Sequence, residues 1–252
     1  MHKIPCHHLR LTVGNSRCLA NHLLDVETAP GLLDWRKARE LGQGLPMKQL
    51  RVVIFAKAPK AGLAKTRLIP TLGELGAAAL ARRLLDNKIT QATLANVGAV
   101  ELCMTPFDDI AWQDVMVPTS ITLSDQGDGD LGERMARACK RVIDGGEGVL
   151  LIGTDCPALD ATCLQQIAQK LNMADAVIVP AADGGYTALG LNRFHSLLFS
   201  DIAWSTESVA FDTLCRLAQL GWSVRQLPML HDVDEPADLQ WLPVDWPETQ
   251  RA

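Results

Sequence analysis

The sequence predicts an α/β domain of three layers, in which helices cover both faces of a mainly parallel central sheet. Short apolar segments rich in β-branched residues alternate with longer segments whose apolar residues recur at helical spacing. The short segments are almost continuously apolar, which is typical of parallel strands buried on both faces. A length of 252 residues is sufficient for one sizeable domain of this class.

The expected elements begin with a strand at 51–56, whose sequence RVVIFA is apolar after its arginine. Further strands are expected at 98–104, 120–124, 149–154, 176–180, 186–191 and 222–227. Apolar residues at helical spacing predict helices at 74–95, 132–143, 160–171 and 206–220. Asp160 suits the N-cap of the third helix and Ser205 or Thr206 that of the fourth, which Gly221 would end.

Residues 1–46 differ in kind from the rest of the chain. They hold four of the six histidines and no convincing strand, whereas a strong strand follows directly after Met47. Two interpretations remain open: a poorly ordered or helical extension, or a segment upstream of a natural start at Met47 in an over-extended reading frame. Both interpretations place a single domain at 47–245.

The composition excludes several classes of partner. A net charge of −5 gives no global positive field to gather nucleic acid or an anionic membrane surface. No run of about eighteen apolar residues is present for a spanning helix, and the N-terminus lacks the apolar core of a secretory signal. The seven cysteines are scattered and odd in number. The sequence therefore predicts a cytoplasmic protein with no nucleic-acid partner and no membrane partner.

The loop after the first predicted strand gathers positive charge. It begins at Ala56 and carries four cations around one glycine: Lys57, Lys60, Lys65 and Arg67 around Gly62. Ligands of open α/β sheets bind beyond the carboxyl ends of strands. A glycine lets backbone N–H groups approach an anion, while lysine and arginine add charge. In a net-negative chain this concentration predicts a phosphate site, against the simpler alternative of a solvated basic loop.

Two glycine motifs do not fit the better-known nucleotide folds. Lys65 and Thr66 echo a P-loop, but Ala64 stands where that motif needs glycine, so a P-loop kinase or GTPase is excluded. The segment QGDGDLG at 126–132 spells G-x-G-x-x-G, but its aspartates would repel a pyrophosphate. A metal or sugar-hydroxyl contact, or a flexible turn, fits that segment better.

Asp155 follows the predicted strand at 149–154, in the string GTDCPAL. A carboxylate at that end of a strand is directed toward the same crevice as the cationic loop. Mg²⁺ or Mn²⁺ on a nucleotide is usually held by one or two carboxylates with phosphate oxygens and water. Asp155 is therefore the first candidate for a metal-binding catalytic residue; the alternative is an aspartate that only forms the turn before Pro157.

A second acidic cluster, HDVDEPADL at 231–239, follows the last predicted strand. Asp232 and Asp234 alternate along an extended segment, so they share one face, and one of the pair is expected to be a second metal ligand. Asp234, before Glu235 and Pro236, also has the features of a helix N-cap, and both roles can hold at once.

Two further segments supply candidate substrate contacts. In Asp183-Gly184-Gly185-Tyr186 the glycines permit close approach of a ligand, and Asp183 could accept a proton from an acceptor hydroxyl. A tight hairpin would need the same glycines. Trp204 stands before a predicted helix start whose N–H groups could face the ligand, although capping alone explains the serine and threonine that follow it.

Six strings in order between residues 49 and 239 resemble a known family. They are FAKAPKAGLAKTRL, QGDGDLGERM, GTDCPAL, DGGYTALGL, DIAWSTESV and DVDEPADL. Together they resemble the GT-A-like superfamily of nucleotide-dependent transferases. Within it, the chain is similar to a family of small bacterial glycosyltransferases, some of which are linked with radical-SAM/selenodomain or arsenosugar gene sets.

The resemblance implies a Rossmann-like GT-A fold that binds a nucleotide at its first strand–helix loop, with Mg²⁺ or Mn²⁺ as cofactor. Asp155 stands where such folds place a metal-binding acidic residue, and Asp234 where nucleotidyltransferase relatives place another. The sequence departs from the D-x-D form of many glycosyltransferases, because Gly153 occupies the place of the first aspartate. Metal binding would therefore depend on a distant partner such as Asp234.

Three functions remain open. In glycosyl transfer, which is the leading expectation, cations stabilise a departing nucleoside diphosphate from a nucleotide sugar while Asp183 or another carboxylate deprotonates a small-molecule acceptor. In nucleotidyl transfer, as in the molybdenum-cofactor and phospholactate guanylyltransferases, an acceptor phosphate attacks a nucleoside triphosphate and pyrophosphate leaves; the four loop cations suit a triphosphate. The third function is nucleotide binding without catalysis, against which the converging charges argue.

Overall fold

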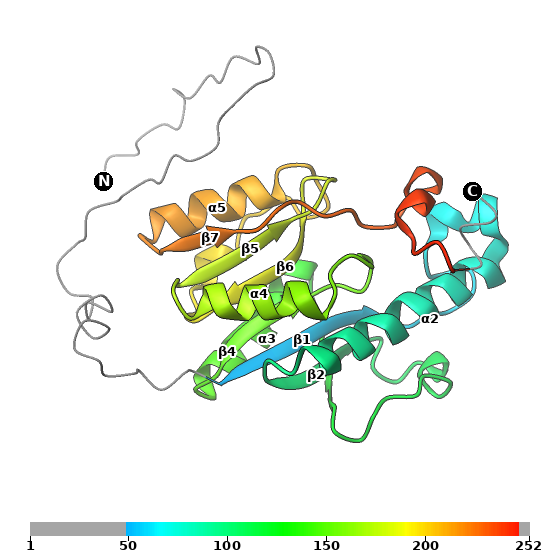
Figure 1. The fold of residues 1–252 in the computed structure, drawn as a ribbon, viewed down its shortest axis with the longest axis horizontal. Coiled ribbons are helices and arrows are strands. Elements are labelled where there is room, and N and C mark those ends of the chain that lie inside the picture. Colours follow the sequence, from blue (N-terminus) through cyan, green and yellow to red (C-terminus); the bar gives the residue numbers. More distant parts are fainter. Residues whose placement is uncertain (1–48, 247–252) are drawn as a thin grey trace, which may run out of the picture. The chain divides into compact units, whose positions relative to one another are not determined.

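A seven-stranded sheet forms the centre of the structure, a computed structural model that describes residues 49–246 (Figure 1). The strand order is β3-β2-β1-β4-β6-β5-β7, and only β6 runs antiparallel to its neighbours β4 and β5. The predicted three-layer Rossmann-like α/β class with a mainly parallel sheet is confirmed. The expectations for residues 1–46 lie outside the described residues.

The strands lie close to their predicted positions. Their bounds are β1 Leu50–Lys57, β2 Ala99–Thr105, β3 Thr122–Asp125, β4 Gly148–Ile152, β5 Ala176–Pro180, β6 Tyr186–Leu191 and β7 Val224–Gln226. The largest shifts are at β3 and β7, which each begin two residues later than expected. Both are edge strands whose side chains are largely exposed. Their sequences therefore carry a weak apolar signal.

Within residues 49–246, four α-helices and four short 3-10 helices lie between or after these strands. The α-helices are α2 Ile69–Ala95, α3 Leu131–Asp144, α4 Ala161–Leu171 and α5 Val209–Gln219. The 3-10 helices are η1 Thr66–Leu68, η2 Ile110–Trp112, η3 Ser196–Leu198 and η4 Pro236–Trp241. Among residues 49–246, none of the helices combines the length and apolarity that a membrane crossing requires.

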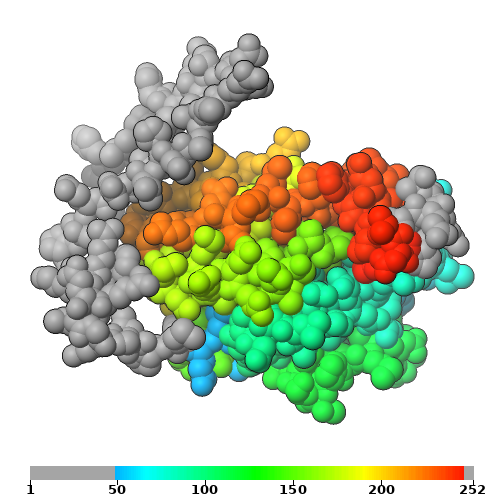
Figure 2. All heavy atoms as spheres, in the orientation of Figure 1, coloured from blue at the N-terminus to red at the C-terminus, as the bar shows by residue number. Residues whose placement is uncertain are grey.

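Alternation along the strands divides the core into two faces. Val52 and Ile54 pack with α2 and α4, whereas Val53 between them packs with α3 and α5. Figure 1 shows α2 and α4 side by side in front of the sheet, and in Figure 2 their side chains form a continuous surface over that face. Because both faces are covered, the inner strands of the sheet are apolar almost throughout.

A third apolar cluster joins α2 to the C-terminal segment. Its members include Leu68, Leu72, Leu80, Leu84, Val233, Leu239 and Leu242. Figure 1 shows η4 (red) beside the first half of α2 (cyan). The cluster therefore brings residues 232–239 next to the loop that follows β1, although the two segments are far apart in the sequence.

The helix ends confirm two predictions and correct a third. Asp160 caps α4, because its Oδ1 accepts a hydrogen bond of 2.8 Å from Cys163 N, and Gly221 follows α5 with φ 65°. The expected cap of α5 at Ser205 or Thr206 is wrong. Thr206 Oγ1 donates to Ala203 O at 2.6 Å, so these residues form a turn of their own and the helix begins later, at Val209.

Candidate functional site

A cleft of about 490 Å³ opens at the carboxyl ends of β1 and β4. The loop after β1, the loop after β4 and the C-terminal segment all contribute to it. The charged side chains that line it are Lys57, Lys65, Arg67, Arg134, Asp155 and Asp234. The cationic loop and the two expected carboxylates therefore share one cleft, as the sequence predicted.

Lys65 lies at the centre of this charged group. Its Nζ is 2.6 Å from Asp155 Oδ1 and 2.9 Å from Asp234 Oδ1, and it donates to Val233 O at 2.7 Å. The three contacts use all three ammonium protons, and only 7% of the side chain is exposed. Burial alone would lower the pKa of Lys65, but Asp155 and Asp234 outweigh it and raise the pKa. Lys65 is therefore a firmly charged internal cation.

Local contacts hold the two carboxylates in place. Thr154 Oγ1 donates to Asp155 Oδ1 at 3.0 Å, and Val233 N donates to Asp155 O at 2.8 Å. The expected N-cap role of Asp234 is wrong by one residue. Glu235 is the N-cap of η4. The carboxylate of Asp238 completes the cap, because it accepts hydrogen bonds from Asp234 N and Glu235 N. The side chain of Asp234 is therefore available to Lys65.

The donor set fits a divalent cation bound together with a phosphate ligand. No group of three or more histidine, cysteine, aspartate or glutamate side chains within residues 49–246 could hold a metal ion by itself. Asp155 and Asp234, however, lie close enough together for one cation, the Lys65 ammonium, to contact both. Two carboxylates completed by phosphate oxygens and water are a common arrangement for Mg²⁺ or Mn²⁺.

Asp232 adds a third, more deeply placed carboxyl group. Burial raises its pKa to about 7, and the negative charges of Asp155, Asp234 and Asp183 act in the same direction. Lys65 opposes them without cancelling their effect. The protein thus gathers four acidic side chains at this end of the sheet, and one of them is partly protonated near neutral pH.

The cationic loop is shaped mainly by its own hydrogen bonds. Leu63 N and Ala64 N both donate to Lys60 O, at 3.1 and 2.9 Å, so these N–H groups are already used inside the loop. Gly62 has φ 77°, which favours glycine and allows this tight turn. The glycine therefore serves loop geometry first, and the positive charge is carried by side chains.

The loop cations divide into two groups. Lys57 and Arg67 line the cleft. Arg67 is well exposed, with a long contact of 3.6 Å to Glu235. Lys60 points elsewhere and pairs with Asp109 at 3.2 Å. Two side chains in addition to Lys65 are therefore placed to meet an anion in the cleft.

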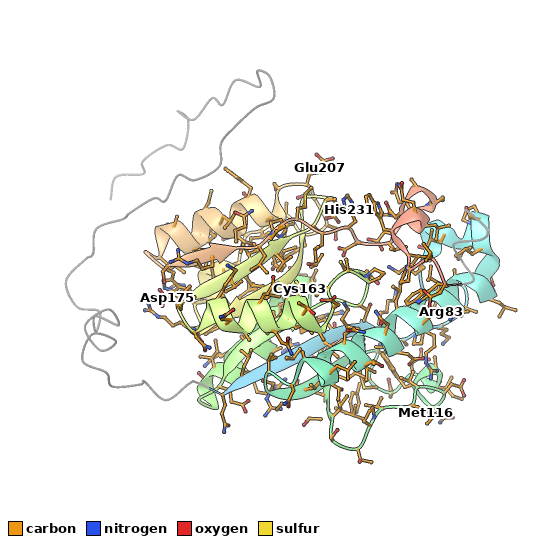
Figure 3. All side chains as sticks on the ribbon, viewed as in Figure 1. Arg83, Met116, Cys163, Asp175, Glu207 and His231 are labelled. Atoms are coloured by element: carbon orange, nitrogen blue, oxygen red, sulfur yellow. The ribbon has the colours of Figure 1, made fainter. Side chains whose placement is uncertain are left out.

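The Asp183-Gly184-Gly185 segment is the hairpin turn between β5 and β6. Ala181 N donates to Gly185 O at 2.9 Å, and Asp183 Oδ1 accepts from Gly185 N at 2.9 Å. Gly184 has φ 89°, and a Cβ placed there would lie 2.2 Å from Glu207 O. Glu207, labelled in Figure 3, thus lies on the segment that packs against this turn. Close packing accounts for Gly184, and none of the three residues lines the cleft.

Tyr186 and Trp204 are the two aromatic residues expected to contact a substrate. Both side chains pack on the α3 face of the sheet. The Tyr186 hydroxyl contacts Met135 Sδ at 3.8 Å, and a Cβ on Gly132 would lie 2.3 Å from Trp204 Nε1. Neither residue lines the cleft. Their large rings pack against the core beside α3.

The G-x-G-x-x-G segment forms a turn that leads into α3. Asp125 Oδ1 accepts from Gly127 N at 2.8 Å, and Asp130 caps the helix in a capping box with Glu133. Arg137 donates to the backbone carbonyls of Gln126 and Asp128. The aspartates therefore organise the backbone, in agreement with the interpretation of this segment as a turn.

Three residues near the site were not predicted from sequence. Arg134 lines the cleft from α3, and Gln126, which is buried, donates to Ala56 O at 3.2 Å and to Cys103 O at 3.0 Å. Lys88 is fully buried in α2 and donates to the loop after β4. Only Lys88 gives a sequence signal, since it is a charged residue on the apolar stripe of a predicted helix.

The chain is similar in sequence and fold to known proteins. Residues 88–206 match a family described as "Uncharacterized protein conserved in bacteria (DUF2064)". No curated protein matches the chain. A crystal structure described as a "putative nucleotide-diphospho-sugar transferase" from Desulfovibrio desulfuricans G20 is 31% identical. The match covers 75% of this chain and 84% of that one, with a TM-score of 0.69.

More distant structures share the fold alone. The 4-diphosphocytidyl-2C-methyl-D-erythritol synthase from Anaerococcus prevotii DSM 20548 is 13% identical, over 76% of this chain and 92% of that one, with a TM-score of 0.50. The bifunctional IspDF from Campylobacter jejuni is 10% identical, over 77% and 54%, with a TM-score of 0.51. From the identity and coverage of the Desulfovibrio match, the chain belongs to the same family as that protein.

Proposed function

We propose that the protein is a nucleotide-dependent transferase assisted by a divalent metal, and that it transfers a glycosyl group from a nucleotide sugar to a small-molecule acceptor. One observation carries the proposal: Lys65 joins Asp155 and Asp234 at 2.6 and 2.9 Å in the cleft that the cationic loop lines. The description of the Desulfovibrio relative supports the choice of donor.

The residues of the cleft have distinct roles in this proposal. Asp155 and Asp234 would hold Mg²⁺ or Mn²⁺, and the bound metal would offset the charge of the donor's phosphates. Lys57, Arg67 and Arg134 contribute further positive charge around the same space. Charge placed in advance around a departing nucleoside diphosphate stabilises the transition state more than the ground state.

A carboxyl group is also needed to accept the proton of the acceptor hydroxyl. Asp183 is our candidate, because its carboxylate is exposed and is oriented by the hydrogen bond from Gly185 N. Asp183 does not line the cleft, but its negative charge contributes to the raised pKa of Asp232, on which the charges of Asp155 and Asp234 also act. As the donor bond breaks, the hydroxyl oxygen would form the new glycosidic bond and its proton would pass to the carboxylate.

Nucleotidyl transfer is the alternative, and the number of cations favours it. Lys57, Lys65, Arg67 and Arg134 all line one cleft, which suits a triphosphate at least as well as a diphosphate. In that reaction an acceptor phosphate would attack the α-phosphorus of a nucleoside triphosphate, and pyrophosphate would leave. Mg²⁺ or Mn²⁺ would bind to the same carboxylates.

Turnover of a panel of nucleotide sugars and nucleoside triphosphates with Mn²⁺ distinguishes these functions. Release of a nucleoside diphosphate is the expected result, whereas release of pyrophosphate would favour nucleotidyl transfer. Binding without turnover of any donor would support a non-catalytic nucleotide-binding protein. Asp155→Asn serves as the matched control, since it removes a metal ligand with little change in side-chain volume. Equal turnover by this variant would contradict the proposed site.

A further inference from the structure

Lys88 is the largest fully buried side chain of the described domain, and it does not line the cleft. It lies in the C-terminal half of α2, on the buried stripe of the helix. Its Nζ donates to Cys156 O and to Leu159 O, each at 2.7 Å. Both acceptors are backbone carbonyls of the loop that follows β4.

These two carbonyls bracket the turn next to Asp155. Leu159 N donates to Cys156 O at 3.2 Å, which closes the turn, and Asp160 then caps α4. The turn therefore lies between the metal-ligand candidate and the start of a helix. Lys88 links this turn to α2, so a charged hydrogen-bond donor holds the backbone that follows Asp155.

Packing alone does not explain a charged residue at this position. Burial lowers the pKa of Lys88 to about 8, although Asp232 and Asp155 lie near enough to oppose the shift. Replacement of a buried charge by a well-packed apolar side chain is often neutral or stabilising. Methionine at position 88 would continue the apolar stripe but would leave Leu159 O without its donor. The feature that lysine supplies and methionine lacks is the pair of hydrogen bonds to the turn.

We propose that Lys88 is a positioning residue of the transfer site, which holds the turn at 156–159 so that Asp155 meets Asp234 at the geometry a divalent cation needs. This inference rests on the proposed function. Residues that orient metal ligands through hydrogen bonds are required for tight metal binding, and their loss typically lowers metal affinity by about 10- to 100-fold. Both hydrogen bonds of Lys88 go to the loop after β4, whereas the cationic loop follows β1.

The test compares Mn²⁺ binding, followed by electron paramagnetic resonance, with binding of inorganic pyrophosphate in the absence of metal, followed by calorimetry. In Lys88→Met, Mn²⁺ affinity is expected to fall by about tenfold or more, whereas pyrophosphate affinity stays within about twofold. Lys88→Gln keeps an N–H donor on a shorter side chain. It is expected to give an intermediate loss, and it provides the same comparison if Lys88→Met does not fold.

Ile89→Ala is the matched control, since Ile89 is the next residue of α2, is 4% exposed and belongs to the sheet-facing core cluster. It is expected to lower stability while Mn²⁺ affinity stays unchanged. An equal loss of Mn²⁺ affinity in Ile89→Ala, or wild-type affinity in Lys88→Met, would contradict the positioning role of Lys88. Either result would leave the proposed function of the protein intact. A wild-type protein that binds neither Mn²⁺ nor pyrophosphate would contradict the proposed function and this role with it.

Discussion

At the scale of single residues, the contacts of Lys65 determine how the cleft can receive a charged ligand. All three ammonium protons are used inside the protein, on Asp155, Asp234 and Val233 O. Lys65 thus occupies the position between the two carboxylates that a metal ion would take. A phosphate that draws Lys65 toward itself would leave both carboxylates to the metal. Nucleotide and metal are therefore expected to favour each other's binding.

Lys65→Met should tighten Mn²⁺ binding to the ligand-free protein. Because the internal cation no longer competes and the carboxylates lose their partner, we expect an affinity gain of about tenfold, or about 1.4 kcal/mol. Electron paramagnetic resonance of free Mn²⁺ measures this change. Lys60→Met is the control, because Lys60 lies on the same loop but pairs with Asp109. Unchanged Mn²⁺ affinity in Lys65→Met would rule out competition for the carboxylates.

Lys88 makes stability depend on pH in a predictable direction. Its pKa is about 8 in the folded protein against an ordinary value of 10.5. Between these values the unfolded chain binds more protons, so the free energy of unfolding rises with pH. Below pH 8 both states are protonated, and the full cost of the buried charge is present.

Urea unfolding of the wild type and Lys88→Met at pH 7 to 10.5 isolates this contribution. The free energy of unfolding of the wild type, relative to the variant, should rise by about 3 kcal/mol across this range. The variant serves as the reference because other groups that titrate in the same range are common to both proteins. A difference that is independent of pH would show that burial does not lower the pKa of Lys88.

At the scale of elements, close packing explains the glycine at position 184 in the β5–β6 hairpin. Gly184 and Gly146 have nearly the same φ, 89° and 87°. A Cβ at Gly184 would lie 2.2 Å from Glu207 O, whereas a Cβ at Gly146 would meet nothing within 4 Å. Gly184→Ala should therefore be more destabilising than Gly146→Ala, by about 1–3 kcal/mol in the free energy of unfolding. Equal losses in thermal or urea unfolding would mean that the clash is relieved by movement of the Glu207 segment.

The C-terminal segment depends on a different kind of contact. Leu239 is fully buried in the cluster that holds Val233, and with it Asp234, against α2. Leu239→Ala should cost about 2–5 kcal/mol and should also weaken Mn²⁺ binding, since Asp234 loses its support. Leu217→Ala in α5 is the control, because Leu217 is as deeply buried but packs on the other face of the sheet. If both variants lose Mn²⁺ affinity equally, the cluster has no specific effect on Asp234.

The sequence predicted those elements whose signal is local. Periodicity and β-branched content located five strands closely, and Asp160 marked the start of α4 through its own side chain. β3 and β7 were shifted because exposed edge strands have little apolar pattern. The start of α5 was missed because the hydroxyl of Thr206 bonds to a turn carbonyl instead of the helix N-terminus.

The site was predictable only in part, for a related reason. Strand ends identified Asp155 and the cationic loop, because parallel strands present their carboxyl ends to one crevice. Other features depend on contacts between segments that are distant in the sequence. These are the ion pairs of Lys65, the hydrogen bonds of Lys88 to the loop after β4, and the packing of Trp204 on Gly132. Periodicity and short motifs carry no information on such contacts.

At the scale of the whole molecule, the site exists only when the domain is folded. Lys65 and Asp234 lie 169 positions apart in the sequence, and Asp155 lies between them on a third segment. An unfolded chain cannot hold these groups together, so a ligand of the site binds the native state alone. Ligand binding must then raise the stability of the entire domain.

Pyrophosphate together with Mn²⁺ should therefore raise the melting temperature. At a ligand concentration about one hundred times the dissociation constant, the gain is about 2.7 kcal/mol, which corresponds to roughly 5–10 °C for a domain of this size. Differential scanning fluorimetry measures it, with excess EDTA to remove the metal contribution and Asp234→Asn to remove one ligand. Because metal and phosphate support each other, the combined shift should exceed the sum of the two separate shifts. A shift that is the same with EDTA as with Mn²⁺ would show that the carboxylates bind no metal when phosphate is present.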